Sequence, residues 1–243
     1  MCTVTYLPRG SGDYILTSNR DEQAARSPRR ITRMTEGRRL LLFPQDTRAG
    51  GTWIATASDN RTVCLLNGAF EPHLSRPPYR RSRGLMVLDF FDYSGAGAFA
   101  ARYDFAGMEP FTMIIHDRGR LWELRWDERT LHERERNPAD YHIWSSATLY
   151  DAHAHRRREE WFRSWRATQR QHDQAAILDF HRHAGEGDPR NDVVMNRDGM
   201  VQTVSITSII RSGREVRMRY EDLLNRQVEQ SKMQLNSEVV ESP

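Results

Sequence analysis

Cysteine and lysine are both scarce in this chain of 243 residues. The two cysteines, Cys2 and Cys64, are too few for a disulfide framework, and they form no closely spaced pair of the kind that binds metal. Lys232 is the only lysine, so nearly all of the positive charge comes from arginine. Because the guanidinium group forks well onto carboxylates, we expect many arginines in ion pairs with the abundant Asp and Glu residues.

Long apolar runs are also missing. No segment approaches the roughly 20 apolar residues that a membrane-spanning helix requires, and the N-terminus lacks the basic and apolar regions of a secretory signal. The formal net charge of +3 is small for a protein that binds nucleic acid. These absences predict a cytoplasmic globular protein with no membrane span and no nucleic-acid partner. The length favours one large domain.

Short runs of β-branched and aromatic residues, separated by turn residues, predict a fold rich in strands. Strands are expected at 2–7, 14–17, 40–43, 52–56, 62–66, 111–116, 121–126, 131–133, 141–144, 193–196, 203–210 and 215–220. Helices are expected at 82–91, 95–103, 149–170 and 174–183. Because hairpin-length links cannot make parallel crossovers, we predict an α+β fold of layered antiparallel sheets.

Two polar segments are expected to lie outside these strands and helices. Residues 26–39 are basic and polar, which indicates a surface loop around Pro28. Residues 225–243 are rich in Gln, Glu and Ser, which favours a helical extension or a disordered tail. We therefore predict a single domain over residues 1–224, followed by a polar C-terminal tail over residues 225–243.

The start of the chain, Met1-Cys2-Thr3, carries the strongest chemical signal. If Met1 is removed, Cys2 carries both a thiol and a free α-amine, with reference pKa values of about 8.5 and about 7.7–8.0. The amine can then accept the proton of its own thiol, which joins a nucleophile and its base in one residue. If Met1 is retained, the amine is blocked and Cys2 is an ordinary small strand residue.

A dense polar cluster, Ser18-Asn19-Arg20-Asp21-Glu22, follows the second predicted strand. Since this strand pairs back on the first, Arg20 or Asp21 is expected near Cys2. A guanidinium group there would lower the pKa of the thiol, and a carboxylate would hold the α-ammonium group. Adjacent strand residues point to opposite faces, so both can reach Cys2 only if the chain turns. A structural ion pair that fixes the hairpin end is the alternative.

Four short motifs occur together in this chain: Cys2-Thr3, Asn19-Arg20-Asp21-Glu22, Gly50-Gly51-Thr52-Trp53 and Leu66-Asn67-Gly68. In this combination they resemble the NRDE family, relatives of the transport and Golgi organisation proteins. The resemblance covers most of residues 2–220. It implies a four-layer αββα sandwich of the N-terminal-nucleophile (Ntn) hydrolase type, with two antiparallel sheets between helical layers. A more distant similarity to choloylglycine hydrolases and penicillin V acylases follows from the same motifs.

The resemblance also implies a set of site residues. The expected catalytic residues are Cys2, Arg20, Asp21 and Asn67, and the expected substrate-binding residues are Asn19, Thr52, Trp53 and Ser146. Cys2 would attack a carbonyl carbon, and the Asn67 amide would stabilise the oxyanion, a contact that contributes about 10²–10³ in rate. Ser146 stands where these families commonly have an Asn, and it can donate one hydrogen bond.

We therefore predict a cysteine hydrolase that cleaves a non-peptide C–N bond of a small acylated substrate, without a cofactor or a metal. The alternative is a non-catalytic carrier of haem or a lipid-like ligand, because eukaryotic relatives are associated with haem trafficking and lipid handling. A homo-oligomer is left open. Cys64 lies within an apolar predicted strand, and we expect it to be buried and inert.

Overall fold

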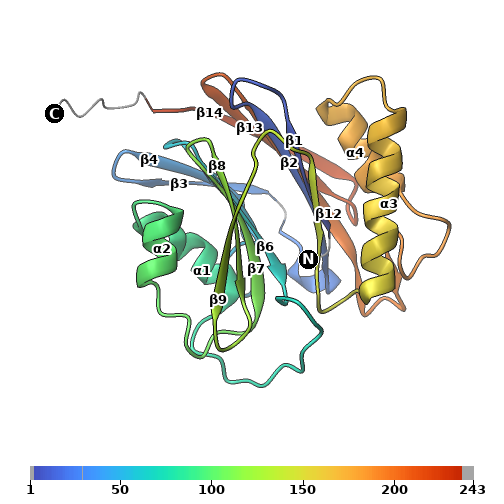
Figure 1. The fold of residues 1–243 in the computed structure, drawn as a ribbon, viewed down its shortest axis with the longest axis horizontal. Coiled ribbons are helices and arrows are strands. Elements are labelled where there is room, and N and C mark those ends of the chain that lie inside the picture. Colours follow the sequence, from blue (N-terminus) through green and yellow to red (C-terminus); the bar gives the residue numbers. More distant parts are fainter. Residues whose placement is uncertain (1–2, 29, 237–243) are drawn as a thin grey trace.

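The computed structural model describes residues 3–28 and 30–236, and two antiparallel sheets form its centre (Figure 1). The strands of the first sheet are β1 (Thr3–Pro8), β2 (Tyr14–Glu22), β10 (His142–Ser145), β11 (Asn196–Arg197), β12 (Val201–Ser212), β13 (Glu215–Asp222) and β14 (Gln227–Gln234). Those of the second sheet are β3 (Ile31–Glu36), β4 (Arg39–Pro44), β5 (Ile54–Ala57), β6 (Arg61–Asn67), β7 (Phe111–Asp117), β8 (Arg120–Trp126) and β9 (Leu131–Arg136).

Hairpins connect most neighbouring strands. The first sheet has the order β10-β1-β2-β12-β13-β14, and β11 pairs with β12. The second sheet runs from β3 to β9 in sequence order. Strands β2 and β12 are far apart in the sequence but are neighbours in the first sheet. Ser18 of β2 pairs there with Val4 of β1 on one side and with Thr207 of β12 on the other.

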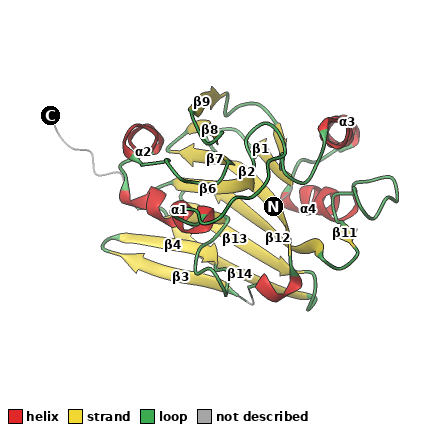
Figure 2. Cartoon of the chain, turned by 90° about the horizontal axis from the view of Figure 1, so that it is seen from below, coloured by secondary structure: helices red, strands yellow, loops and turns green. Residues whose placement is uncertain are grey.

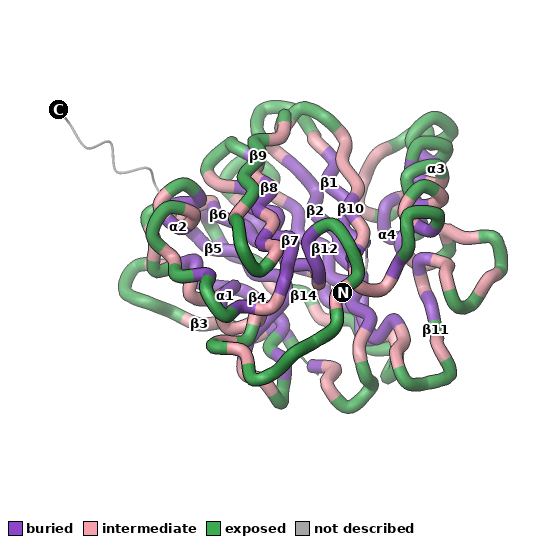
Figure 3. The backbone as a smooth tube through the Cα atoms, turned by 60° about the horizontal axis from the view of Figure 1, so that its bottom comes forward, coloured by how far each residue is buried: buried purple, intermediate pink, exposed green. Residues whose placement is uncertain are grey.

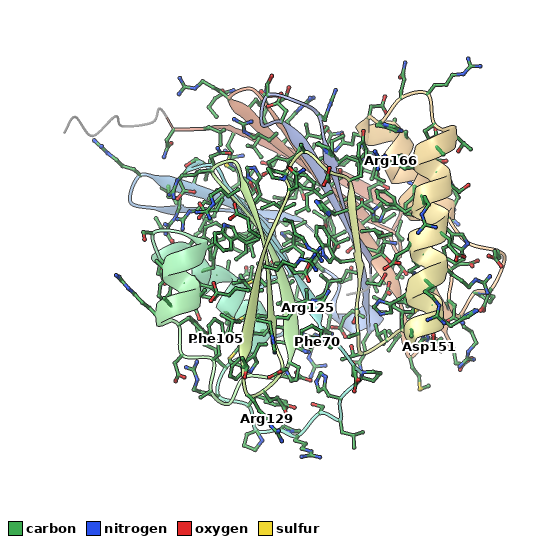
Figure 4. All side chains as sticks on the ribbon, in the orientation of Figure 1. Phe70, Phe105, Arg125, Arg129, Asp151 and Arg166 are labelled. Carbon is green, nitrogen blue, oxygen red and sulfur yellow. The ribbon has the colours of Figure 1, made fainter. Side chains whose placement is uncertain are left out.

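Helices cover the outer face of each sheet (Figures 1 and 2). They are α1 (Arg83–Asp89), α2 (Ala96–Arg102), α3 (Ala152–Thr168) and α4 (Gln174–His183), with short 3₁₀ turns at Ala24–Arg26 and Phe90–Asp92. The longer helices begin at aspartates that accept backbone hydrogen bonds, as Asp151 does from Ala154 at 2.8 Å. Figure 4 shows Asp151 at one end of α3 and Arg166 near the other. None of the described helices is long and apolar enough to cross a membrane.

Two main hydrophobic cores hold these layers together, and Figure 3 shows that buried residues follow most of the central strands. The larger core fills the space between the sheets and extends under α1 and α2. The smaller core packs α3 and α4 on the first sheet through Phe162, Trp165 and Phe180. The predicted α+β, four-layer sandwich is therefore confirmed.

The side chains of β2 alternate between the two cores. Tyr14 and Leu16 belong to the core between the sheets, whereas Ile15 belongs to the core beneath α3 and α4. The strand runs on to Glu22 and does not end at residue 17 as the sequence predicted. The same alternation therefore sends Arg20 toward the space between the sheets and Asp21 toward the helices.

The two segments predicted to lie outside the sheets contain strands instead. Within residues 26–39, β3 forms the edge of the second sheet. Residues 225–243 contain β14, which pairs with β13 over its whole length, so a helical extension or disordered tail is wrong for residues 227–234. Only Met233 is buried in β14, and this scarcity of apolar residues explains why the strand was missed.

The buried side chain of Met233 tests whether β14 belongs to the folded domain. We expect Met233→Ala to lower the free energy of unfolding by about 2–3 kcal/mol, because it removes packed methylenes from the core. The neighbouring Gln234→Ala, at an exposed position, should change it by less than about 0.5 kcal/mol. Urea unfolding measures both, and equal small effects would indicate that β14 is detached from the domain.

Candidate functional site

A cavity of about 340 Å³ is lined by residues of both sheets and by the segment around the start of α1. Its lining consists of Arg20, Glu22, Arg26, Asp46, Ala49, Gly51, Thr52, Trp53, Leu65, Asn67, Tyr79, Arg81, Ser82, Arg83, Gly84 and Glu109. Four of the eight expected site residues are among them, namely Arg20, Thr52, Trp53 and Asn67. The fold therefore brings together residues that are up to 47 positions apart in the sequence.

Arg20 enters the cavity wall as part of a partly buried ion cluster, which we call the Asp46 cluster: Arg20, Glu22, Arg26 and Asp46. The Arg20 guanidinium group donates to Asp46 at 2.5 Å and to the backbone oxygen of Arg26 at 2.6 Å. Arg26 bridges Glu22 and Asp46, each at 2.8 Å. The carbon of the Arg20 guanidinium group also lies 4.3 Å from the centre of the Trp53 ring. Arg20 is thus fixed in place by charge, hydrogen bonds and stacking.

The charges of this cluster depend on one another. Burial alone would raise the pKa of Asp46, but the backbone amides of Ala49 and Arg48 and the guanidinium groups of Arg20 and Arg26 hold that pKa below its ordinary value. Burial lowers the pKa of Arg20, and the carboxylate of Asp46 opposes that shift. Asp46 therefore keeps a buried arginine charged at the cavity wall.

Asp21 lies on the opposite face of β2. Its carboxylate accepts hydrogen bonds from the Tyr150 hydroxyl at 2.9 Å and from the Thr203 hydroxyl at 2.6 Å. On β12, Thr203 pairs with Asp21 and Ser205 pairs with Arg20, so Val204 is the extra residue of a β-bulge. The chain does not turn between Arg20 and Asp21, and their side chains diverge as the strand period requires.

Asn19 also faces the helices and does not line the cavity. Its amide nitrogen donates to the backbone oxygens of His181 (3.1 Å) and Val193 (2.9 Å). Because the amide nitrogen is a donor, its oxygen accepts from Nδ1 of His181, and Nε2 of His181 then accepts from the Thr5 hydroxyl at 2.8 Å. Asn19 thus ties α4 to the first sheet, and this contact is structural.

Asn67 ends β6 at the cavity. Its backbone oxygen accepts a hydrogen bond from the hydroxyl of Ser146 at 2.8 Å, whereas its side-chain amide makes no hydrogen bond within residues 3–28 and 30–236. Behind it, Arg125 donates to the backbone oxygen of Ala69 at 2.6 Å and stacks on Phe70, 5.1 Å from the ring centre (Figure 4). Ser146 therefore supports Asn67 and does not itself line the cavity.

The Gly50-Gly51-Thr52-Trp53 motif shapes the cavity by bringing two backbones together. A Cβ atom on Gly51 would lie 2.3 Å from the carbonyl carbon of Gly84, at the start of α1. The amide of Thr52 donates to the backbone oxygen of Gly84 at 3.0 Å, and the Thr52 hydroxyl donates to the backbone oxygen of Pro44 at 2.7 Å. Thr52 is therefore occupied by the backbone, and the motif positions Trp53 beside Arg20.

The predicted nucleophile, Cys2, lies outside the described residues. Cys64 is fully buried in β6, and burial raises the pKa of its thiol to about 12, which makes it a poor nucleophile. Among the described residues, no group of three or more His, Cys, Asp or Glu side chains converges as metal ligands would.

Sequence reasoning missed several residues that hold the site together. Asp46 and Arg26 complete the partly buried ion cluster, and Tyr150 and Thr203 hold Asp21. Arg83 and Glu109 form an ion pair of 2.9 Å across the cavity wall. They belong to loops, to a 3₁₀ turn, to the start of α1 and to β12, and only the three-dimensional fold brings them to the motif residues.

Solved structures of other proteins share this fold. An N-acylethanolamine-hydrolyzing acid amidase ortholog from Caenorhabditis elegans matches with a TM-score of 0.56 and 11% identity, covering 86% of this chain and 92% of that chain. A mutant of the conjugated bile acid hydrolase from Clostridium perfringens matches with a TM-score of 0.52 and 9% identity, covering 96% and 92%. At these identities the likeness concerns the fold, and the fold is that of the Ntn hydrolases.

A sequence profile then places the chain within a particular family. The profile of Transport and Golgi organisation 2 matches residues 1–192, which is most of the chain. The chain therefore belongs to the Transport and Golgi organisation 2 family, and the expected relationship to these proteins is confirmed. The NRDE name is not part of this match. Among curated proteins, no sequence matches this chain.

The His181 contacts predict how stability depends on pH. Burial lowers the pKa of His181 to about 3, from an ordinary value of 6.5. Its contribution to stability is present above pH 6.5 and is lost as the pH falls toward 3, because the unfolded chain binds the proton first. As the pH falls from 6.5 toward 3, the free energy of unfolding of the unsubstituted protein should therefore decrease more steeply than that of His181→Gln. The difference between the two slopes should reach about 1.4 kcal/mol per pH unit.

Urea unfolding between pH 7 and pH 4 measures this difference. His153→Gln is the control, since His153 is an exposed histidine of α3. His116, whose pKa is likewise lowered to about 3 by burial, is retained in all three proteins and cancels in the comparison. Parallel curves for the unsubstituted protein and His181→Gln would contradict a buried, neutral His181.

The contact between Gly51 and Gly84 gives a second prediction for the site. We expect Gly51→Ala to lower the free energy of unfolding by about 1–3 kcal/mol, because the added methyl group forces the start of α1 away. Gly97→Ala in α2 is the matched control, since its Cβ would meet no atom within 4 Å. The control should be neutral or stabilising, as alanine is the better helix former. Equal effects in thermal unfolding would refute the close approach.

Proposed function

We propose that this protein is an Ntn-type cysteine amidase that cleaves the C–N bond of a small acylated substrate through a thioester on Cys2. The observation that supports this most strongly is the cavity itself. Arg20 and Asn67 lie on different sheets, yet both line it, and the sequence had assigned both to one reaction. The amidase fold of the solved structures that match this chain supports the same proposal.

Covalent geometry supports Cys2 as the nucleophile. Thr3 is the first residue of β1, which pairs with β2 so that Val4 lies opposite Ser18. Arg20 comes two residues after Ser18, on the same face of β2. Consecutive Cα atoms are only about 3.8 Å apart, so the bond between residues 2 and 3 keeps Cys2 near the end of β1. The position of the Cys2 side chain in the cavity is part of the proposal.

Each residue then has a defined role. With Met1 removed, the α-amine accepts the thiol proton, and the thiolate attacks the carbonyl carbon of the substrate. Arg20 stabilises the thiolate, and the Asn67 amide donates to the oxyanion of the tetrahedral intermediate. The C–N bond breaks as the α-ammonium group returns its proton to the leaving amine. Water then hydrolyses the thioester to release the acid.

Asp21 holds the α-amine in this scheme. Its two hydroxyl partners, Tyr150 and Thr203, fix the carboxylate at the outer face of β2. Because the chain does not turn between Arg20 and Asp21, the scheme requires the terminal residue to direct its thiol toward Arg20 on the inner face of β2 and its amine toward Asp21 on the outer face.

The alternative, a carrier of haem or a lipid-like ligand, finds less support in the cavity. Pockets for such ligands are lined mainly by apolar side chains. Here seven charged residues share the lining with Ala49, Trp53, Leu65 and the ring of Tyr79. A Soret shift on titration with haemin would favour the carrier.

The nucleophile hypothesis is tested first by mass and labelling. We expect the intact mass of the purified protein to show that Met1 is removed, because only then is the α-amine free. An electrophilic acyl probe should then modify Cys2 in preference to Cys64, whose thiol is buried and has a raised pKa. A protein that keeps Met1 quantitatively would rule out this mechanism.

The oxyanion role of Asn67 gives a kinetic prediction. With a short-chain acyl p-nitroanilide as substrate, Asn67→Ala should lower kcat by about 10²–10³ with little change in KM, because the contact forms in the transition state. Asn137→Ala, at an exposed loop position, is the control and should retain full activity. If both variants retain full activity, Asn67 has no part in the reaction.

A further inference from the structure

The charged residues of the cavity wall form two groups. In the Asp46 cluster, two arginines face two carboxylates, so that group is balanced. The other group contains Arg81, Arg83 and Glu109. We call Arg81 and Arg83 the arginine pair. Glu109 pairs with Arg83, and Asp89, which does not line the cavity, pairs with Arg81, so each arginine of the pair has one carboxylate partner.

The arginine pair retains donors for a ligand. Arg83 donates from Nη1 to the backbone oxygen of Pro110 at 2.8 Å, and its Nη2 pairs with Glu109 at 2.9 Å. Arg81 uses Nε and Nη2 on Asp89, a residue of α1 that does not line the cavity. Nε of Arg83 and Nη1 of Arg81 therefore have no hydrogen-bond partner in the part of the chain that the structure describes.

These side chains are also held in place by their surroundings. Glu109 is shared between Arg83 and His73, which lies 3.2 Å away. The Asp89 carboxylate that holds Arg81 also accepts a hydrogen bond from the Tyr103 hydroxyl at 3.0 Å. A fixed guanidinium group loses little conformational entropy when it binds an anion, and its planar fork matches a carboxylate.

A long acyl chain would have few apolar partners on this wall. It would lie against charged side chains that include Arg81, Arg83 and Glu109. Removing water from charged groups without new polar partners costs free energy. At about 340 Å³, the cavity is also near the lower end of the range of about 300–1,000 Å³ for small-molecule sites.

We infer that the substrate is a small, polar acylated compound that carries a carboxylate, and that the arginine pair binds this carboxylate. The inference rests on the proposed amidase function and adds the substrate class. Arg20 and Asn67 act on the scissile bond, whereas Arg81 and Arg83 contact a group remote from it. The arginine pair therefore sets specificity and takes no part in bond breaking.

Matched substrates test this inference on either side of the scissile bond. On the acyl side, succinyl p-nitroanilide is compared with butyryl p-nitroanilide, which has a similar length and no charge. On the amine side, N-acetylphenylalanine is compared with N-acetylphenethylamine. We expect the carboxylate to raise kcat/KM by about tenfold or more in at least one pair, because hydrogen bonds to charged groups are the stronger ones. Octanoyl p-nitroanilide should be the poorest anilide.

Variants of the arginine pair test the assignment. Arg81→Gln and Arg83→Gln should each reduce the preference for the carboxylate, mainly through KM, while cleavage of the uncharged member is retained. Arg120→Gln is the control, because Arg120 pairs with Glu135 on an exposed part of the second sheet, away from the cavity. If Arg83→Gln does not fold, the double variant Arg83→Gln/Glu109→Gln is used in its place, because it removes both charges of the ion pair between Arg83 and Glu109.

Binding to Cys2→Ala separates this inference from the proposed function. Calorimetric titration of this variant should show tighter binding of the succinyl than of the butyryl anilide. Such a preference without any turnover by the unsubstituted protein would support the substrate class and overturn the amidase proposal. Turnover with no preference in either pair, or with octanoyl p-nitroanilide as the best anilide, would overturn the inference and leave the amidase proposal standing.

Discussion

The alternation of side chains along β2 is the constraint on which the site depends. In five consecutive residues, Ser18 to Glu22, the strand has no freedom to choose a face, because β12 pairs with it as far as Glu22 and β1 pairs with it as far as Ser18. Arg20 therefore meets the cavity, and Asn19 and Asp21 meet the helices. One strand thus supplies a structural anchor for α4, a cation for the cavity and a carboxylate for the opposite face.

Burying Arg20 requires the rest of the Asp46 cluster. A guanidinium group taken out of water is costly unless it is paired and hydrogen-bonded, and Asp46 meets that need from the loop after β4. The same loop reaches Gly51 and Thr52, which pack against the start of α1 and so carry Arg83 to the cavity wall. The loop between β4 and β5 thus both pairs with the charge of Arg20 and positions the start of α1 at the cavity wall.

The sequence predicted what local patterns encode. Most strands, the four main helices and the layered α+β class follow from apolar periodicity and turn residues, and strand alternation anticipated that Arg20 and Asp21 diverge. Edge strands β3 and β14 were missed because their few buried residues give a weak pattern. Asp46 and Glu109 were missed because isolated acidic residues in loops carry no local signal, and their pairing with arginine depends on long-range packing.

The central claim is that Cys2 forms a thioester in the cavity that Arg20 and Asn67 line. The most direct measurement is peptide mapping of protein quenched in acid while it turns over a p-nitroanilide substrate. The account predicts that the acyl group is found on the N-terminal peptide, on the sulfur of a Cys2 that no longer follows Met1. Steady turnover with the acyl group on Cys64 would contradict the account. Steady turnover by a protein that retains Met1 and yields no acylated peptide would contradict it as well.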